Sequence, residues 1–205
     1  MAAICLIVGL AIGYLIRGSA SPAVPIRAAA SSDTQDPHAA MGQQGMPSLA
    51  DMKRMADKQA EPLLATLKHD PTDVQTLNKT ALTYKAAHQF QEAIAYFQKA
   101  LAIDPKNVPI RTDMASCMYY SGDVDGAITE LQKSLTYNPR HAGTLMNLGI
   151  IKWQGKQDVS GAITAWQTLL RLNPDFPQKN VIEHLIEQAK QSETPPTAAE
   201  LDPKH

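Results

Sequence analysis

The sequence predicts an all-α protein in which antiparallel helix pairs stack into an array. The first observation is a set of prolines separated by 34, 34 and 35 residues: Pro71, Pro105, Pro139 and Pro174. The second is that small and large apolar residues recur at the same places in each interval. The third is an aromatic content of only 5%, which suits thin helical layers built on Ala and Leu. Self-similarity at this period indicates a helical repeat array.

Composition excludes several function classes. The formal net charge is −1 over 205 residues, so no basic footprint for nucleic acid is present. The two cysteines, Cys5 and Cys117, are far apart and form no CxxC, which argues against a redox or zinc site. We interpret both as small apolar residues.

Residues 1–17 predict a membrane anchor, because the run from Ala2 is uncharged until Arg17. The run is shorter than the roughly 20 residues that cross a bilayer core. A cleaved signal peptide with an upstream start and a buried helix are the alternatives, although no basic region precedes the run. Gly9 and Gly13 form a GxxxG that could pair two anchors in a homodimer, and Tyr14 and Arg17 complete the predicted anchor residues.

The segments that flank the repeats have different predicted roles. Residues 18–47 are rich in Ser, Ala, Pro, Gly and Gln and predict a flexible tether. Residues 48–73 predict capping helices or a half repeat, with Pro62 beginning the second helix. Residues 177–191 predict a C-terminal capping helix and residues 192–205 a disordered tail. The apolar stripe of that capping helix is Val181, Leu185, Ile186 and Ala189.

Three units of about 34 residues, 74–107, 108–141 and 142–176, carry the repeat. Small residues recur midway along the first helix of each unit, at Ala81, Ala115 and Gly149. Large apolar residues, among them Phe97, Leu131 and Trp166, fill the spaces between the helices, so small-on-large packing is expected. Asp73 and Asn107 are candidate caps, and an Asp-Pro or Asn-Pro pair ends each second helix. Gly122 and Gly155 mark the turns within the pairs. The Gly155–Ala162 interval is longer than its unit-two counterpart, which predicts a longer turn in unit three.

The repeat resembles the tetratricopeptide repeat (TPR) family, in a membrane-anchored bacterial form. The residues that carry the resemblance in unit one are Leu77, Ala81, Tyr84, Phe90, Ala93, Phe97, Ala100 and Pro105. The resemblance implies a right-handed superhelical solenoid whose first helices line a concave groove. It also implies a partner protein that binds there as a peptide or helix.

The resemblance places a set of outward positions in that groove. The predicted partner-binding residues are Asn78, Lys85, Tyr119, Tyr120, Met146, Ile150 and Trp153. Tyr119, Tyr120 and Trp153 are not required by the repeat pattern, and aromatic residues with a polar tip are typical interface anchors. The alternative is that they pack against the capping helices. Some relatives clamp a terminal carboxylate in this groove, but the corresponding positions here carry no basic residue: Asn78, Leu82, Asp113, Gly143 and Asn147.

No catalytic constellation, metal site or cofactor site is predicted. The six histidines are scattered, and neither a phosphate-binding glycine loop nor a GxSxG is present. We therefore expect a non-catalytic, membrane-tethered adaptor for another protein. One alternative is a c-type cytochrome maturation factor that holds an apocytochrome, since residues 161–167 resemble that group. Another is a self-associating scaffold.

The side of the membrane follows from two opposed arguments. Arg17 and Arg27 after the apolar run favour a cytoplasmic position for the rest of the chain. A basic N-terminus upstream, or the cytochrome role, requires the opposite side. The expected localisation is a membrane with a single-pass N-terminal anchor and a periplasmic folded domain, with the side left open.

Overall fold

The structure is a computed structural model that describes residues 47–193 of the chain. The predicted anchor (1–17), nearly all of the tether (18–47) and the last twelve residues lie outside the described part. Among residues 47–193, no helix is long and apolar enough to cross a membrane.

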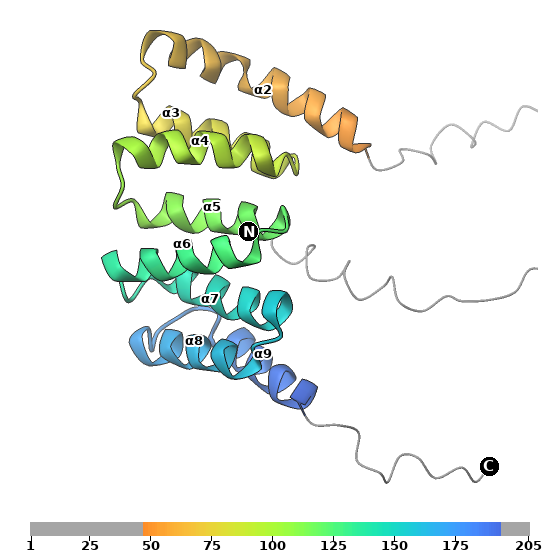
Figure 1. Ribbon diagram of the computed structural model, residues 1–205, viewed down its shortest axis with the longest axis vertical. Helices are drawn as coiled ribbons and strands as arrows, with labels where there is room; N and C mark the ends of the chain where they lie inside the picture. Colours follow the sequence, from red (N-terminus) through yellow and green to blue (C-terminus); the bar gives the residue numbers. More distant parts are fainter. Residues whose placement is uncertain (1–46, 194–205) are drawn as a thin grey trace, which may run out of the picture. The chain divides into compact units, whose positions relative to one another are not determined.

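The described chain is an array of helices that stack in sequence order (Figure 1). Helix α2 (Leu49–His69) is followed by three pairs and by α9 (Lys179–Glu193). The pairs are α3 (Val74–Ala86) with α4 (Phe90–Ile103), α5 (Val108–Tyr120) with α6 (Val124–Tyr137), and α7 (Ala142–Ile150) with α8 (Val159–Leu172). A π-helical segment, η1 (Ile151–Gly155), continues α7. Residues 47–193 contain no strand, which confirms the all-α class.

Capping side chains fix where the helices begin. Asp73 accepts from the backbone N–H of Gln75 at 3.0 Å, and Asn107 accepts from that of Ile110 at 3.2 Å, which confirms both predicted caps. Helices α4, α6 and α8 each end at the residue before an Asp-Pro or Asn-Pro pair. Proline disfavours the α conformation in the residue before it, so the sequence sets the C-terminal end of each second helix.

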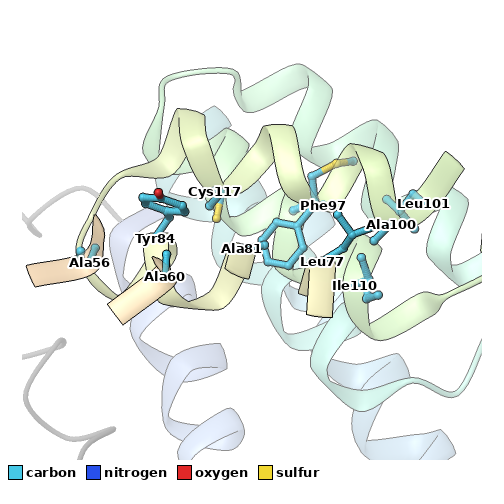
Figure 2. Close-up of a cluster of buried hydrophobic side chains, with 13 residues drawn as sticks. Ala56, Ala60, Leu77, Ala81, Tyr84, Phe97, Ala100, Leu101, Ile110 and Cys117 are labelled. Carbon is cyan, nitrogen blue, oxygen red and sulfur yellow. The ribbon is translucent and has the colours of Figure 1, made fainter. Parts of the chain in front are cut away.

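Small-on-large packing fills the interior. Figure 2 shows the first cluster, in which Phe97 lies against Leu77 and Ala81. All three side chains are at most 2% exposed. Cys117 is buried in the same cluster, and burial raises the pKa of its thiol to about 11. This confirms Cys117 as a packing residue.

The prediction that Pro62 begins a second helix is wrong. Pro62 lies inside the single 21-residue helix α2. It is exposed, so its ring disturbs no packed neighbour, and the helix continues with Thr66 Oγ1 donating to the Pro62 carbonyl at 3.1 Å. A capping box between Ser48 and Asp51 begins the helix instead.

The predicted longer turn in unit three is also wrong. The positive-φ residues of the three turns are His88, Gly122 and Gln157, which precede the second helices by the same interval. Gly122 has φ 91° as expected, whereas Gly155 lies in the π-helical segment. The extra residue of unit three is therefore a π-bulge in the first helix, where the wider i→i+5 turn accommodates it.

Helix α9 covers the last unit with a different stripe from the one predicted. Ile182, Ile186 and Ala189 are buried, whereas Val181 is 51% exposed. Ile182, one residue later, takes the place that the sequence assigned to Val181. The helix continues to Glu193, beyond the predicted boundary at residue 191.

Candidate functional site

A small hollow lies where α5 meets α7 and η1. It encloses about 60 Å³ and is lined by Ser116, Tyr119, Tyr120, Asn147, Ile150 and Ile151. Helix α5 contributes the first three residues, and the end of α7 with the start of η1 contributes the others. Three predicted binding residues, Tyr119, Tyr120 and Ile150, therefore meet in one place.

The hollow is supported by uncharged hydrogen bonds between two repeats. Asn147 Nδ2 donates to Ser116 Oγ at 3.0 Å, and that hydroxyl donates to the Thr112 carbonyl at 3.1 Å. Further along the same pair of helices, the hydroxyls of Thr112 and Thr144 are 2.6 Å apart. Buried hydroxyl and amide groups that are paired in this way hold α5 against α7 in one register.

Aromatic rings form the rim of the hollow. Tyr120 is 56% exposed, and its ring stacks on Phe90 with centroids 5.2 Å apart. The ring centroids of Tyr119 and Tyr120 are 5.3 Å apart, and those of Phe90 and His88 are 5.6 Å apart. Burial, with a smaller contribution from Tyr120, raises the pKa of the Tyr119 phenol, so its hydroxyl stays protonated and able to donate.

Lys85 and Asn78 lie on α3, away from the lining of the hollow. Lys85 Nζ is 2.6 Å from Asp113 Oδ1, which ties α3 to α5 and neutralises both charges. Asn78 is half-buried, and its Oδ1 accepts no hydrogen bond within residues 47–193. Neither side chain joins the tyrosines.

Met146 and Trp153 pack inside the C-terminal part of the array. Both contact the buried cluster that contains Trp166 and the apolar face of α9. The Trp153 ring meets Trp166 edge to face at 5.9 Å, and Trp153 Nε1 donates to Ser192 Oγ at 3.3 Å. Trp153 therefore packs against the C-terminal capping helix α9, which is the alternative that the sequence analysis left open for the aromatic residues.

Four contributors are absent from the predicted binding residues: Ser116, Asn147 and Ile151 in the lining, and Phe90 beside Tyr120. Phe90 was assigned only to the repeat core, yet its ring also supports Tyr120. Ile151, the first residue of the π-helical segment, also lines the hollow. The repeat register alone could have predicted that Phe90 lies near the end of α5. The only sign of the bulge in the sequence is the one extra residue of unit three. Within residues 47–193, no group of His, Cys, Asp and Glu side chains has the geometry to hold a metal ion.

Comparison with known families identifies the repeat. A tetratricopeptide repeat family model matches residues 84–146, from the end of α3 to the middle of α7. This part of the chain matches the tetratricopeptide repeat family. The matched segment contains three of the six residues that line the hollow, Ser116, Tyr119 and Tyr120, and the other three follow its end.

The chain is also similar to part of a known protein and, in fold, to solved structures. The general transcriptional corepressor trfA of Dictyostelium discoideum is 26% identical over 87 residues, which is 42% of this chain and 6% of that protein. The chain therefore corresponds to a small part of that relative. The crystal structure of MamA superposes with a TM-score of 0.55 at 22% identity, covering 70% of this chain and 90% of MamA. The first TPR of Spaghetti (RPAP3) bound to the HSP90 peptide SRMEEVD superposes with a TM-score of 0.54 at 18% identity. The match covers 60% of this chain and 94% of the RPAP3 chain.

Proposed function

We propose that the protein is a non-catalytic adaptor that binds a segment of a partner protein on the face formed by α3, α5 and α7. Tyr119, Tyr120 and Ile150 make the main contacts. The observation that carries the proposal is the hollow between α5 and α7, with a 56% exposed tyrosine at its rim. Large aromatic side chains next to a concave site are the usual anchors of protein interfaces. The RPAP3 repeat supports the proposal, because a protein of similar fold is bound there to a peptide.

The charge of the partner differs from that of the RPAP3 ligand. That peptide, SRMEEVD, contains two Glu and one Asp. In the present chain Lys85 is already paired with Asp113, and the lining of the hollow contains no cationic side chain. An acidic segment would lose water here without gaining a cation, so we expect it to bind poorly.

The adaptor is membrane-tethered in this proposal. The uncharged run of residues 1–17 is the anchor, and the polar residues 18–47 are the tether. A flexible chain of this length spans about 30 Å root-mean-square, which keeps a captured partner near the bilayer. The folded part is periplasmic in the proposal, and a cytochrome-maturation role depends on that side. The test is a reporter that is active only in the cytoplasm, fused after His205. Activity of this reporter would exclude both the periplasmic position and the cytochrome-maturation role.

Site-specific crosslinking tests the adaptor function. A photo-reactive amino acid replaces Tyr120 in the full chain, and the matched control replaces Tyr137, an exposed tyrosine at the end of α6. We expect an adduct with a distinct protein from position 120 and much less from position 137. Adducts only between two copies of this chain would favour the self-associating scaffold. Equal adducts from both positions would contradict the proposed site.

A further inference from the structure

A second hollow lies at the N-terminal end of the array, between α2 and α3. It encloses about 280 Å³, and its lining includes Met52, Met55, Ala56, Thr83, Ala86 and Ala87. Met55 is 55% exposed although it lies in a described helix with apolar neighbours on α3. Methionine side chains are flexible and polarisable, so this hollow can adapt to different apolar groups.

A row of rings joins the two hollows. Ala87 lines the N-terminal hollow, and the next residue, His88, contacts Phe90 edge to face. Phe90 stacks on Tyr120, and Tyr120 adjoins Tyr119, which lines the hollow between α5 and α7. The C-terminal ends of α3 and α5 lie at the same edge of the array (Figure 1). We call the group of residues from Met55 through His88, Phe90, Tyr120 and Tyr119 to Ile150 the edge band.

The edge band contains no Asp, Glu, Lys or Arg. Neither hollow has an Asp, Glu, Lys or Arg in its lining. An ionised side chain entering either one would be desolvated without a partner, which disfavours binding. Charge matching therefore selects an occupant that is uncharged where it touches the band. A lipid surface fits less well, because attraction to anionic headgroups needs clustered Lys or Arg, which the band lacks.

We propose that the edge band docks an uncharged segment of the partner protein, with one large apolar side chain in the methionine-lined hollow and a smaller one between α5 and α7. The two hollows differ about fivefold in volume, at about 280 and 60 Å³, which sets the order of large and small groups. The ring row between them offers a platform for the connecting residues. The inference rests on the proposed adaptor function and adds the chemistry and extent of its ligand.

Designed peptides test the edge band on the full chain. The probes are 16-residue peptides of Ser, Gln and Gly that carry one Phe and one Val at varied spacings and a neutral fluorophore. Fluorescence anisotropy gives their dissociation constants. We expect at least one spacing to bind saturably, and replacement of its Phe by Asp to weaken binding at least tenfold. Absence of binding at every spacing, or equal binding of the Asp peptide, would overturn the inference.

Substitutions separate the two proposals. Met55→Asp and Tyr120→Ala should each weaken the best peptide about tenfold or more, the size of effect seen at interface hot spots. Met55→Leu should preserve binding. Val181→Asp is the control, because Val181 is similarly exposed, at 51%, on the opposite end of the array. Thermal unfolding checks that every variant folds.

Each pattern of results has one meaning. If Tyr120→Ala weakens binding but Met55→Asp does not, the edge band is wrong and the adaptor site between α5 and α7 stands. If neither variant changes binding and position 120 gives no partner adduct, both proposals fail. Anionic phosphatidylglycerol vesicles serve as a second probe. Vesicle binding that Met55→Asp abolishes would assign the band to lipid and overturn the inference.

Discussion

Gly149 on α7 lies directly against the indole of Trp166 on α8. A Cβ at Gly149 would be 2.1 Å from Trp166 Nε1, so no side chain fits there without movement. The indole is fully buried and donates to the Met146 carbonyl at 3.2 Å. At the corresponding repeat positions, the first unit has Ala81 and Phe97, and the second unit has Ala115 and Leu131. The largest residue on the second helix is thus matched with the smallest on the first.

Gly149→Ala should destabilise the protein despite the better helix propensity of alanine. The propensity gain is about 1 kcal/mol, and overpacking a filled core costs about 1–3 kcal/mol. We expect the free energy of unfolding in urea to fall by up to about 2 kcal/mol. Gly149→Ala with Trp166→Leu, which restores the pair found in unit two, should unfold closer to wild type than Gly149→Ala alone. A single variant as stable as wild type would show that the indole can move freely.

Deletion of Gln154 should be tolerated, because it removes the π-bulge. Unit three then has a first helix of the same length as α3 and α5, and Gln154 is exposed. We expect a loss of stability of about 1 kcal/mol or less, as for other surface changes. The control is deletion of Leu82, which is 38% exposed in α3, a helix without a bulge. That deletion rotates the rest of the helix by about 100° and should cost several kcal/mol in thermal unfolding. Equal losses would contradict the assignment of the extra residue to the bulge.

The fold was predictable because its signals are local and repeated. Asp73 and Asn107 can cap helices wherever they stand, and the residue before a proline leaves the α region in any context. Three copies of these signals set the register of α3 to α8. The site was predictable in part for the same reason: register places Tyr119, Tyr120 and Ile150 on facing helices.

The errors have physical causes that the sequence does not encode locally. An extra residue between α7 and α8 fits either a longer turn or a π-bulge, and only packing around Trp166 and α9 decides between them. The bulge and α9 together explain why Trp153 packs against Ser192. Pro62 was misplaced because proline is typical of a first turn, whereas an exposed proline can also persist inside a long helix.

Glu130→Ala should be strongly destabilising because it leaves Arg111 buried without its partner. Arg111 is 4% exposed, and its guanidinium pairs with Glu130 and donates to the Pro105 carbonyl. Removing one member of a buried pair costs about 3–5 kcal/mol, and the partial exposure of Glu130 favours the lower value. Arg111→Met combined with Glu130→Leu removes both charges and should recover most of the loss in urea unfolding. A double variant that is less stable than Glu130→Ala would contradict this account.

The stability of the protein should fall below about pH 6.5 because His141 caps α7 in its neutral form. His141 Nδ1 accepts from the Thr144 backbone N–H at 3.2 Å and lies 2.8 Å from Thr144 Oγ1. Burial lowers the pKa of His141 from 6.5, and the charge of Asp113 only partly opposes this. The unfolded chain therefore binds the proton first as the pH falls. The stabilisation is complete above pH 6.5 and is lost as the pH falls through the folded-state pKa.

Two variants isolate the histidine. His141→Asn keeps a capping acceptor that does not titrate in this range, so its unfolding free energy should change less between pH 7.5 and 5 than that of wild type. His141→Ala should lose about 1 kcal/mol at pH 7.5 and progressively less at lower pH, where the wild-type cap is itself protonated. Urea unfolding at several pH values measures all three proteins. Parallel pH profiles for wild type and His141→Asn would show that His141 does not contribute to the acid sensitivity.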